Sequence, residues 1–301
     1  LAYIAYCYFA KRQFALNAYL CLATVLLIYA FYTAYISAYS SNPAGGINSQ
    51  FLDAMQWMRS NTPANSTVAA VWTDGSVIEG WANRTSYVDS VGGENGTRIE
   101  PFNRWLFNTS NDTSFLYSIG RPDYLVSRVF WYAELQGLYV EANLTNITAY
   151  TYATLTSLNR TEVNGTTYYR FSSGNNTNGY RAALLVVPGA NGTSRFAAFI
   201  GTTASDKLIL IKKVIFYDTK NYNYSIATTN ITNSANYTLL VTYRGSDIVG
   251  GTIVGPKLAT SNFFKFTVLC NAYACPADTA NVTYNAVYIN NDSRIFKINY
   301  K

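Results

Sequence analysis

The chain has 301 residues, a formal net charge of +6 and only 13% charged residues. It holds 27 Tyr and no His, which excludes His-based acid–base catalysis and His-ligated metal sites. The positive balance comes from scarce carboxylates, and no run of Lys or Arg exceeds two residues, so a nucleic-acid-binding surface is not indicated.

The first forty residues are almost free of charge. No charged residue lies between Lys11-Arg12 and Asp53, and Phe14–Ala38 is nearly all apolar, which is long enough to cross a bilayer. The basic pair predicts a cytoplasmic N-terminal side and an extracellular position for everything after about residue 40. A buried helix in a filament core, as in pilin-like subunits, is the alternative for 1–40. The start at Leu1 indicates the tail of a longer protein or a processed form.

The next segment combines helix, strand and loop signals. Apolar residues from Phe51 to Met58 have helical spacing, and Thr62-Pro63 is expected to end that helix. Val68–Trp72 predicts a short strand, followed by a turn at Asp74-Gly75. A polar loop at the end of a strand is a common place for a site in an α/β layer.

This segment carries a family resemblance. It contains Val71-Trp72-Thr73-Asp74-Gly75 and then Asn83-Arg84-Thr85. The arrangement resembles the start of the soluble domain in archaeal oligosaccharyltransferase catalytic subunits, which move a lipid-linked glycan onto asparagine and carry Trp-Trp-Asp-Tyr-Gly there. Trp72 and Gly75 match that motif in place, whereas the acidic residue is shifted by one position to Asp74. The resemblance extends from about residue 14 to 139, with a further similarity of Arg294–Tyr300 to the family's closing strand.

The resemblance implies a remnant acceptor-peptide site made of Trp72, Asp74 and Gly75. Trp72 would pack against the peptide, and Asp74 would accept a hydrogen bond from a Ser or Thr hydroxyl. The alternative is a turn aspartate beside core tryptophans. Further carboxylates follow at Glu79, Asp89 and Glu94. In the family, the metal and catalytic carboxylates lie between upstream membrane helices, so we expect no catalytic residue, metal site or cofactor in this chain; a divalent metal would be bound upstream.

The predicted fold is α+β. After the N-terminal helix, a small α/β layer over 47–142 includes helices at Pro101–Phe107 and Trp131–Glu141 and a strand at Asp123–Val129. From 143 to 301 the pattern favours antiparallel, sandwich-like β modules, with a break near 219–232. The strands expected there are Thr166–Phe171, Ala182–Val187, Arg195–Ile200, Leu208–Tyr217, Tyr237–Tyr243, Phe264–Leu269, Asn281–Ile289 and Arg294–Tyr300.

Glycosylation sequons are unusually dense. Of the 30 asparagines, 16 begin an Asn-x-Ser/Thr triplet, and none of these precedes residue 65. This bias agrees with an exported, glycosylated surface, although an Asn- and Thr-rich β surface also creates some sequons by chance. The sequon asparagines are Asn65, Asn83, Asn95, Asn108, Asn111, Asn143, Asn146, Asn159, Asn164, Asn175, Asn191, Asn223, Asn230, Asn236, Asn281 and Asn291.

The four cysteines fall into two pairs. Cys7 and Cys21 belong to the apolar part, where a thiol behaves as a small hydrophobe. Cys270 and Cys275 lie close together in the part expected outside the cell, which predicts a local disulfide.

Three functions fit these patterns. The first is the exported acceptor-side region of an oligosaccharyltransferase-like membrane protein, catalytically incomplete as this chain, with N-glycans and acceptor peptides as partners. The second is a heavily glycosylated cell-surface structural subunit, of a surface layer or a filament, which associates with identical subunits. The third is a surface module that binds glycans or peptides through exposed aromatic residues.

Overall fold

The computed structural model describes residues 29, 47–88, 96–132, 134–145, 147–173, 179–188, 194–202, 207–228, 234–271 and 274–301. The chain forms two compact units, 1–48 and 49–301. The expected apolar helix Phe14–Ala38 lies outside the described residues except for Tyr29, which is helical. Within the part that is described, no helix has the length and apolar character needed to span a membrane.

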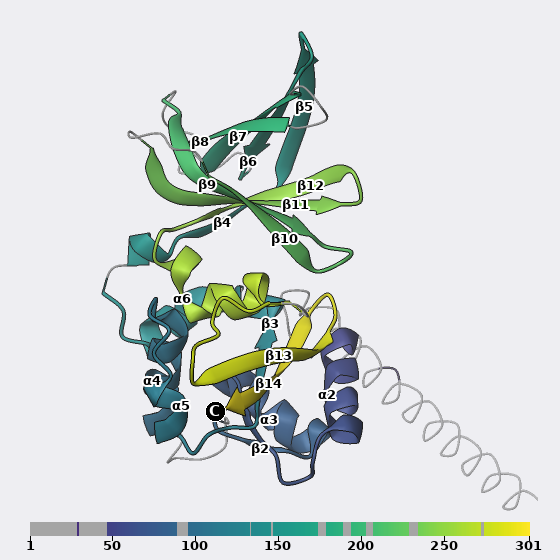
Figure 1. Cartoon of the computed structure of the whole chain (residues 1–301), viewed down its shortest axis with the longest axis vertical. Coiled ribbons are helices and arrows are strands. Elements are labelled where there is room, and N and C mark those ends of the chain that lie inside the picture. Colours follow the sequence, from purple (N-terminus) through teal and green to yellow (C-terminus); the bar gives the residue numbers. More distant parts are fainter. Residues whose placement is uncertain are drawn as a thin grey trace, which may run out of the picture. The chain divides into compact units, whose positions relative to one another are not determined.

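Residues 49–301 contain two sheets and short helices (Figure 1), a mixed α+β fold. The first part of this unit comprises α2 (Ser49–Asn61), β1 (Thr67–Ala69), α3 (Trp72–Val77), the π-helix η1 (Ile78–Ala82), β2 (Thr85–Ser86), α4 (Gly96–Phe107), α5 (Ser114–Ser118), β3 (Tyr124–Arg128), the 3-10 helix η2 (Val129–Tyr132), α6 (Leu135–Glu141) and η3 (Ile147–Tyr150). It is followed by β4 (Tyr152–Leu155), β5 (Ser157–Val163), β6 (Thr166–Ser172), β7 (Tyr180–Pro188), β8 (Ser194–Thr202), β9 (Ile209–Asp218), β10 (Asn223–Thr228), β11 (Ala235–Arg244) and β12 (Asp247–Val254). The last elements are η5 (Leu258–Thr260), α7 (Asn262–Phe264), the π-helix η6 (Lys265–Leu269), β13 (Val282–Ile289) and β14 (Ser293–Tyr300).

The five-stranded sheet has the order β13-β14-β3-β1-β2. β1 is parallel to both β2 and β3, whereas β14 is antiparallel to β3 and to β13. Alternate residues of β1 and β3 enter two cores: Val68 and Val126 pack with α2 on one face, while Ala69 and Leu125 pack with α4 on the other. This part is therefore a three-layer arrangement, with α2 and α4 on opposite sides of the sheet (Figure 1).

Helix α2 ends where the sequence predicts, at Asn61, immediately before Thr62-Pro63. Its last carbonyls are satisfied by the buried guanidinium of Arg84, which donates to the Arg59 carbonyl at 2.8 Å and to the Thr62 carbonyl at 2.5 Å. Helix ends leave such carbonyls without intrahelical partners, so Arg84 acts as a C-terminal cap supplied by a distant segment.

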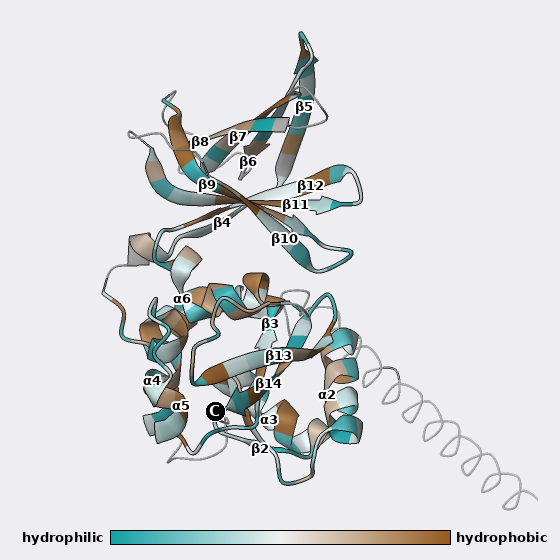
Figure 2. Ribbon diagram, viewed as in Figure 1, coloured by the Kyte–Doolittle hydropathy of each residue, from teal (hydrophilic) through white to brown (hydrophobic). Residues whose placement is uncertain are grey.

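The second sheet has nine strands in the order β4-β12-β11-β9-β8-β7-β6-β5, with β10 paired to β9. Its pairs are antiparallel except β9 with β11. Hydrophilic and hydrophobic residues are mixed along strands such as β5 (Figure 2), without strict alternation. Leu155 of β4 and Phe171 of β6 share one apolar core although their strands are far apart in the sheet order, so the sheet folds over its own interior.

Two sequence-based expectations of local structure are wrong. The strand expected over Phe264–Leu269 is helical. The Ser261 side chain caps α7 by accepting from the Phe264 amide, and the whole segment is buried, which overrides the strand-like alternation of its first residues. The strand expected to end at Trp72 ends at Ala69, and Asp74-Gly75 lies inside α3 rather than in a turn. β10 occupies the region of the expected break, and the domain limits stay a prediction.

Gly255 offers a direct test of packing between the β12 end and the segment before β4. A Cβ at Gly255 would lie 2.6 Å from the Ala149 carbonyl oxygen and 2.7 Å from the Thr151 nitrogen, both backbone atoms that cannot rotate away. We expect Gly255→Ala to lower the free energy of unfolding by about 1–3 kcal/mol. Thermal unfolding of the full chain measures this.

The matched control is Gly137→Ala in α6, where a new Cβ meets nothing within 4 Å. Alanine is favoured over glycine within helices by about 0.5–1 kcal/mol, so this variant should unfold at an unchanged or higher temperature. If the two variants unfolded at the same temperature, the close approach of backbone atoms at Gly255 would be contradicted.

Candidate functional site at the ends of β1 and β3

The candidate site lies where two neighbouring parallel strands end. Val68 of β1 is paired with Tyr124 of β3, and Ala69 with Leu125. The chain leaves β1 into α3 and leaves β3 into η2 and α6. Because parallel strands have their carboxyl ends at the same edge, the start of α3 meets the segment that leads into α6.

Asp74 is buried at this edge, with 1% of its surface exposed. Its Oδ1 accepts a hydrogen bond from Arg128 Nη1 at 2.7 Å, and its Oδ2 accepts one from Trp131 Nε1 at 2.7 Å. Both carboxylate oxygens are therefore engaged by donors of the chain itself. The burial and these two bonds favour a structural role for Asp74 over direct contact with a Ser or Thr hydroxyl, although Asp74 lies in α3 and not in the turn of the alternative.

Arg128 lies between two carboxylates. Besides Asp74, it binds Asp292, with its Nε 2.9 Å from Asp292 Oδ2, and its guanidinium covers the Phe51 ring at 3.8 Å from the centroid. Burial raises the pKa of Asp74, an effect that Arg128 and Trp131 oppose. Burial alone would lower the pKa of Arg128, but the two carboxylates outweigh it and raise that pKa. This buried network joins α2, α3, β3 and the turn before β14.

Four partly exposed side chains cover the network: Trp72, Thr73, Glu134 and Glu141, which we call the strand-end ledge. Trp72 Nε1 donates to Glu141 Oε1 at 2.8 Å, and Thr73 Oγ1 donates to Glu134 Oε2 at 3.0 Å. Burial raises the pKa of Glu134, and the bond from Thr73 opposes that rise. Both oxygens of Glu141 are engaged, since Oε2 also accepts from Asn103 Nδ2 at 2.8 Å. The ledge therefore presents an indole and the Glu134 carboxylate, which can accept hydrogen bonds from a ligand.

Glu134 and Glu141 did not emerge as site residues from the sequence. The sequence feature that could have identified them is their spacing, because residues seven positions apart lie on the same face of the helix expected over Trp131–Glu141. The helix is in fact divided into η2 and α6, with Glu134 at the start of α6.

The other residues singled out around the motif lie apart from the ledge contacts. Gly75 is buried within α3, and Trp81 is exposed on η1. The Glu79 carboxylate accepts from the Ser86 amide at 3.3 Å. Asp89 and Glu94 are outside the described residues.

The sequon asparagines within the described ranges are on the surface. All of them have exposed side chains except Asn108, which is half-buried. Three, at positions 83, 143 and 164, adopt the positive φ that asparagine tolerates better than most residues. Their occupancy by glycans stays a prediction; Asn95, Asn146, Asn175, Asn191 and Asn230 lie outside the described residues.

Cys270 and Cys275 form a disulfide, the pairing that their spacing predicts. Cys7 and Cys21 lie outside the described residues. Among the described residues, no three His, Cys, Asp or Glu side chains gather into a potential metal site.

Comparison with known proteins gives structural neighbours only. No family model matches the chain, and no curated protein matches it. The chain is similar to the C-terminal domain of C. jejuni PglB, with a TM-score of 0.46 and 12% identity over 82% of this chain and 99% of that one. It is also similar to the C-terminal globular domain of an Archaeoglobus fulgidus oligosaccharyltransferase (AfAglB-S2), with a TM-score of 0.25 and 12% identity over 38% of this chain and 94% of that one.

A third neighbour is an Archaeoglobus fulgidus oligosaccharyltransferase tethered through a disulfide to an acceptor peptide that contains the NVT sequon. The TM-score is 0.30 and the identity 18%, over 64% of this chain and 24% of that one. This chain thus spans about a quarter of that enzyme's length. The structural neighbours include C-terminal domains of oligosaccharyltransferases, the family that the sequence resembles.

The buried network predicts a severe effect for Arg128→Met. Two carboxylates would remain in the core without their cation, and breaking such a pair costs about 3–5 kcal/mol. Arg104→Met is the control, because Arg104 pairs with Glu100 at 2.9 Å on the surface, where an ion pair contributes about 1 kcal/mol or less. Thermal unfolding should separate the two variants clearly; similar melting temperatures would show that Arg128 does not hold this edge.

Proposed function

We propose that the chain is the exported acceptor-side region of an oligosaccharyltransferase-like membrane protein, which contacts acceptor peptides but does not complete glycosyl transfer alone. The catalytic carboxylates and the divalent metal would be supplied by upstream membrane segments, as the sequence resemblance implies. The observation that carries the proposal is the strand-end ledge at the motif, where a half-exposed Trp72 is followed by Thr73, whose hydroxyl binds the Glu134 carboxylate.

The ledge suits an extended peptide with a Ser or Thr hydroxyl. A peptide hydroxyl or amide donates hydrogen bonds, and Glu134 is an acceptor-only group when ionised. Trp72 provides a large, stiff apolar surface for the peptide chain. Asp74 contributes indirectly, since it fixes the start of α3 through Arg128 and Trp131.

Membrane attachment and export are part of the proposal. The apolar stretch Phe14–Ala38 follows a basic pair, which favours an external position for the rest of the chain. The surface position of the described sequon asparagines and the Cys270–Cys275 disulfide support that placement.

The exposed sequons also favour the second candidate, a glycosylated surface-layer or filament subunit on the same scaffold. Mass analysis of the native protein separates the two. Peptides upstream of Leu1 that continue into further membrane helices support the transferase-like protein, whereas an abundant surface chain with glycans on many sequons supports the structural subunit.

The peptide proposal is tested by titrating the full chain in detergent with two short peptides, one containing Asn-x-Thr and the other Asn-x-Ala. We expect the Asn-x-Thr peptide to bind about tenfold more tightly, which corresponds to about 1.4 kcal/mol for its hydroxyl. Trp72→Ala should weaken both peptides. Glu134→Gln should reduce the preference between them, because a neutral amide oxygen accepts a weaker hydrogen bond than a carboxylate. Equal affinity of the parent chain for both peptides would contradict hydroxyl recognition.

Glu100→Gln is the matched control, because it removes an exposed carboxylate on α4 that lies outside the ledge. The pH dependence gives a second readout. Because burial raises the pKa of Glu134, it takes up a proton at a higher pH than an exposed glutamate does. It then loses its negative charge and part of its acceptor capacity. The affinity for the Asn-x-Thr peptide should fall as the pH drops through that range, and this fall should be absent in Glu134→Gln.

A further inference from the structure

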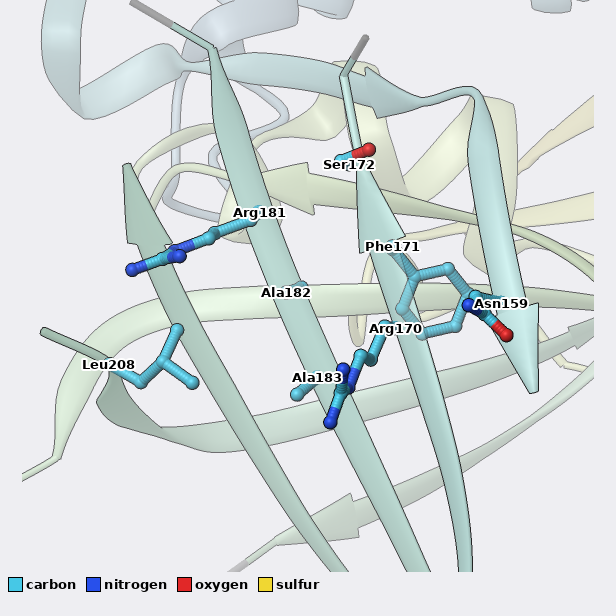
Figure 3. A pocket seen from close by; sticks show the side chains of 8 residues that line it. All are labelled: Asn159, Arg170, Phe171, Ser172, Arg181, Ala182, Ala183 and Leu208. Carbon is cyan, nitrogen blue, oxygen red and sulfur yellow. The ribbon is translucent and has the colours of Figure 1, made fainter. Parts of the chain in front are cut away.

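A hollow of about 440 Å³ lies on the nine-stranded sheet, away from the strand-end ledge. Strands β5, β6 and β7 supply most of its wall (Figure 3). Its lining includes Asn159, Arg170, Ser172, Arg181, Ala183 and Leu208. This volume exceeds what a single inorganic ion needs and falls in the range of small-molecule sites.

The strand register places the polar groups of the hollow together. Asn159 is directly opposite Arg170, which is opposite Ala183, and Ser172 is directly opposite Arg181. Arg170 and Arg181 are therefore diagonal neighbours on one face, where such positions are about 7–8 Å apart. The intervening Phe171 and Ala182 contribute to the core on the other face.

A glycine shapes one side of the hollow. A Cβ at Gly201 would lie 2.7 Å from the Lys207 carbonyl oxygen, 3.0 Å from Leu208 and 3.4 Å from Arg181 Nε. The missing side chain thus allows the Lys207–Leu208 backbone to approach β8. Arg181 extends from β7 on the side where Leu208 lies, and Arg170 lies beside Ala183 (Figure 3).

The charged groups that line the hollow are all positive. Two guanidinium groups line it, and no carboxylate appears among its lining residues. Arginine stays protonated and binds carboxylate or phosphate oxygens with paired hydrogen bonds. The Asn159 amide and the Ser172 hydroxyl can bind sugar hydroxyls, while Ala183 and Leu208 offer apolar contact to a ring face.

We propose that this hollow binds an acidic sugar, with the carboxylate held by Arg170 and Arg181 and the hydroxyl groups by Asn159 and Ser172. The proposal does not depend on peptide binding at the strand-end ledge. Two sources have this chemistry. Asn159 begins the sequon Asn159-Arg160-Thr161, so a glycan linked there would start within the hollow; a sugar residue of a separate glycan is the other source.

The test uses the full chain produced in a host without N-glycosylation and titrated with glucuronate, glucose and inorganic phosphate. We expect glucuronate to bind at least tenfold more tightly than either of the others. Arg170→Ala and Arg181→Ala should each weaken glucuronate at least tenfold. Arg195→Ala is the control, since this exposed arginine on β8 lies outside the lining.

Each other result counts against the site. If phosphate bound as tightly as glucuronate, the hollow would be a simple anion site. If glucose bound as tightly as glucuronate, the two arginines would not contribute to recognition. Thr161→Ala, which removes the sequon but keeps Asn159, distinguishes the sources in the native host. If the linked glycan fills the hollow, only this variant takes up added glucuronate; if a separate glycan is the ligand, both the parent and the variant take it up.

Discussion

Arg128 holds the carboxylates of Asp74 and Asp292 in the interior of the three-layer part, and its guanidinium covers Phe51. These contacts join four segments to one cation: α2, α3, the end of β3 and the turn before β14. A buried arginine is tolerable only where carboxylates and hydrogen bonds compensate it, so each of the four segments must arrive correctly for the others to be satisfied. The position of the candidate site follows from this constraint.

At the motif, the network distinguishes buried residues that support the site from partly exposed residues that a ligand could contact. Both carboxylate oxygens of Asp74 accept hydrogen bonds, from Arg128 and from Trp131, and these bonds fix the first turn of α3. Trp72 and Thr73 then lie at the partly exposed edge. Glu134 then supplies an acceptor carboxylate from the segment after β3, whereas the Glu141 carboxylate is held by Trp72 and Asn103. Arg84 plays a comparable structural role at the end of α2, where it satisfies backbone carbonyls. Thus Asp74, which the resemblance assigns to the acceptor-peptide site, is a support in the structure.

Local signals predicted much of the fold. The Thr62-Pro63 stop, the β3 strand and most strands after residue 143 depend on spacing and turn chemistry, which act over a few residues. Phe264–Leu269 is a helix although its first residues alternate as in a strand, because the whole segment is buried and its burial depends on distant parts of the chain. The pairing of β14 with β3 joins residues about 170 positions apart, and no local pattern reports such a contact. For the same reason, the Asp74–Arg128 bond and the diagonal arrangement of Arg170 and Arg181 required the tertiary structure.

Photo-crosslinking tests the central claim most directly, since it locates a bound acceptor peptide without assuming its affinity. An Asn-x-Thr peptide carrying a photoreactive group would be irradiated with the full chain, and the attachment points would be mapped by mass spectrometry. Our account predicts attachment within Trp72–Val77 and at or near Glu134–Glu141, reduced by excess unlabelled peptide. Attachment confined to the nine-stranded sheet, or equal attachment of an Asn-x-Ala peptide, would contradict it.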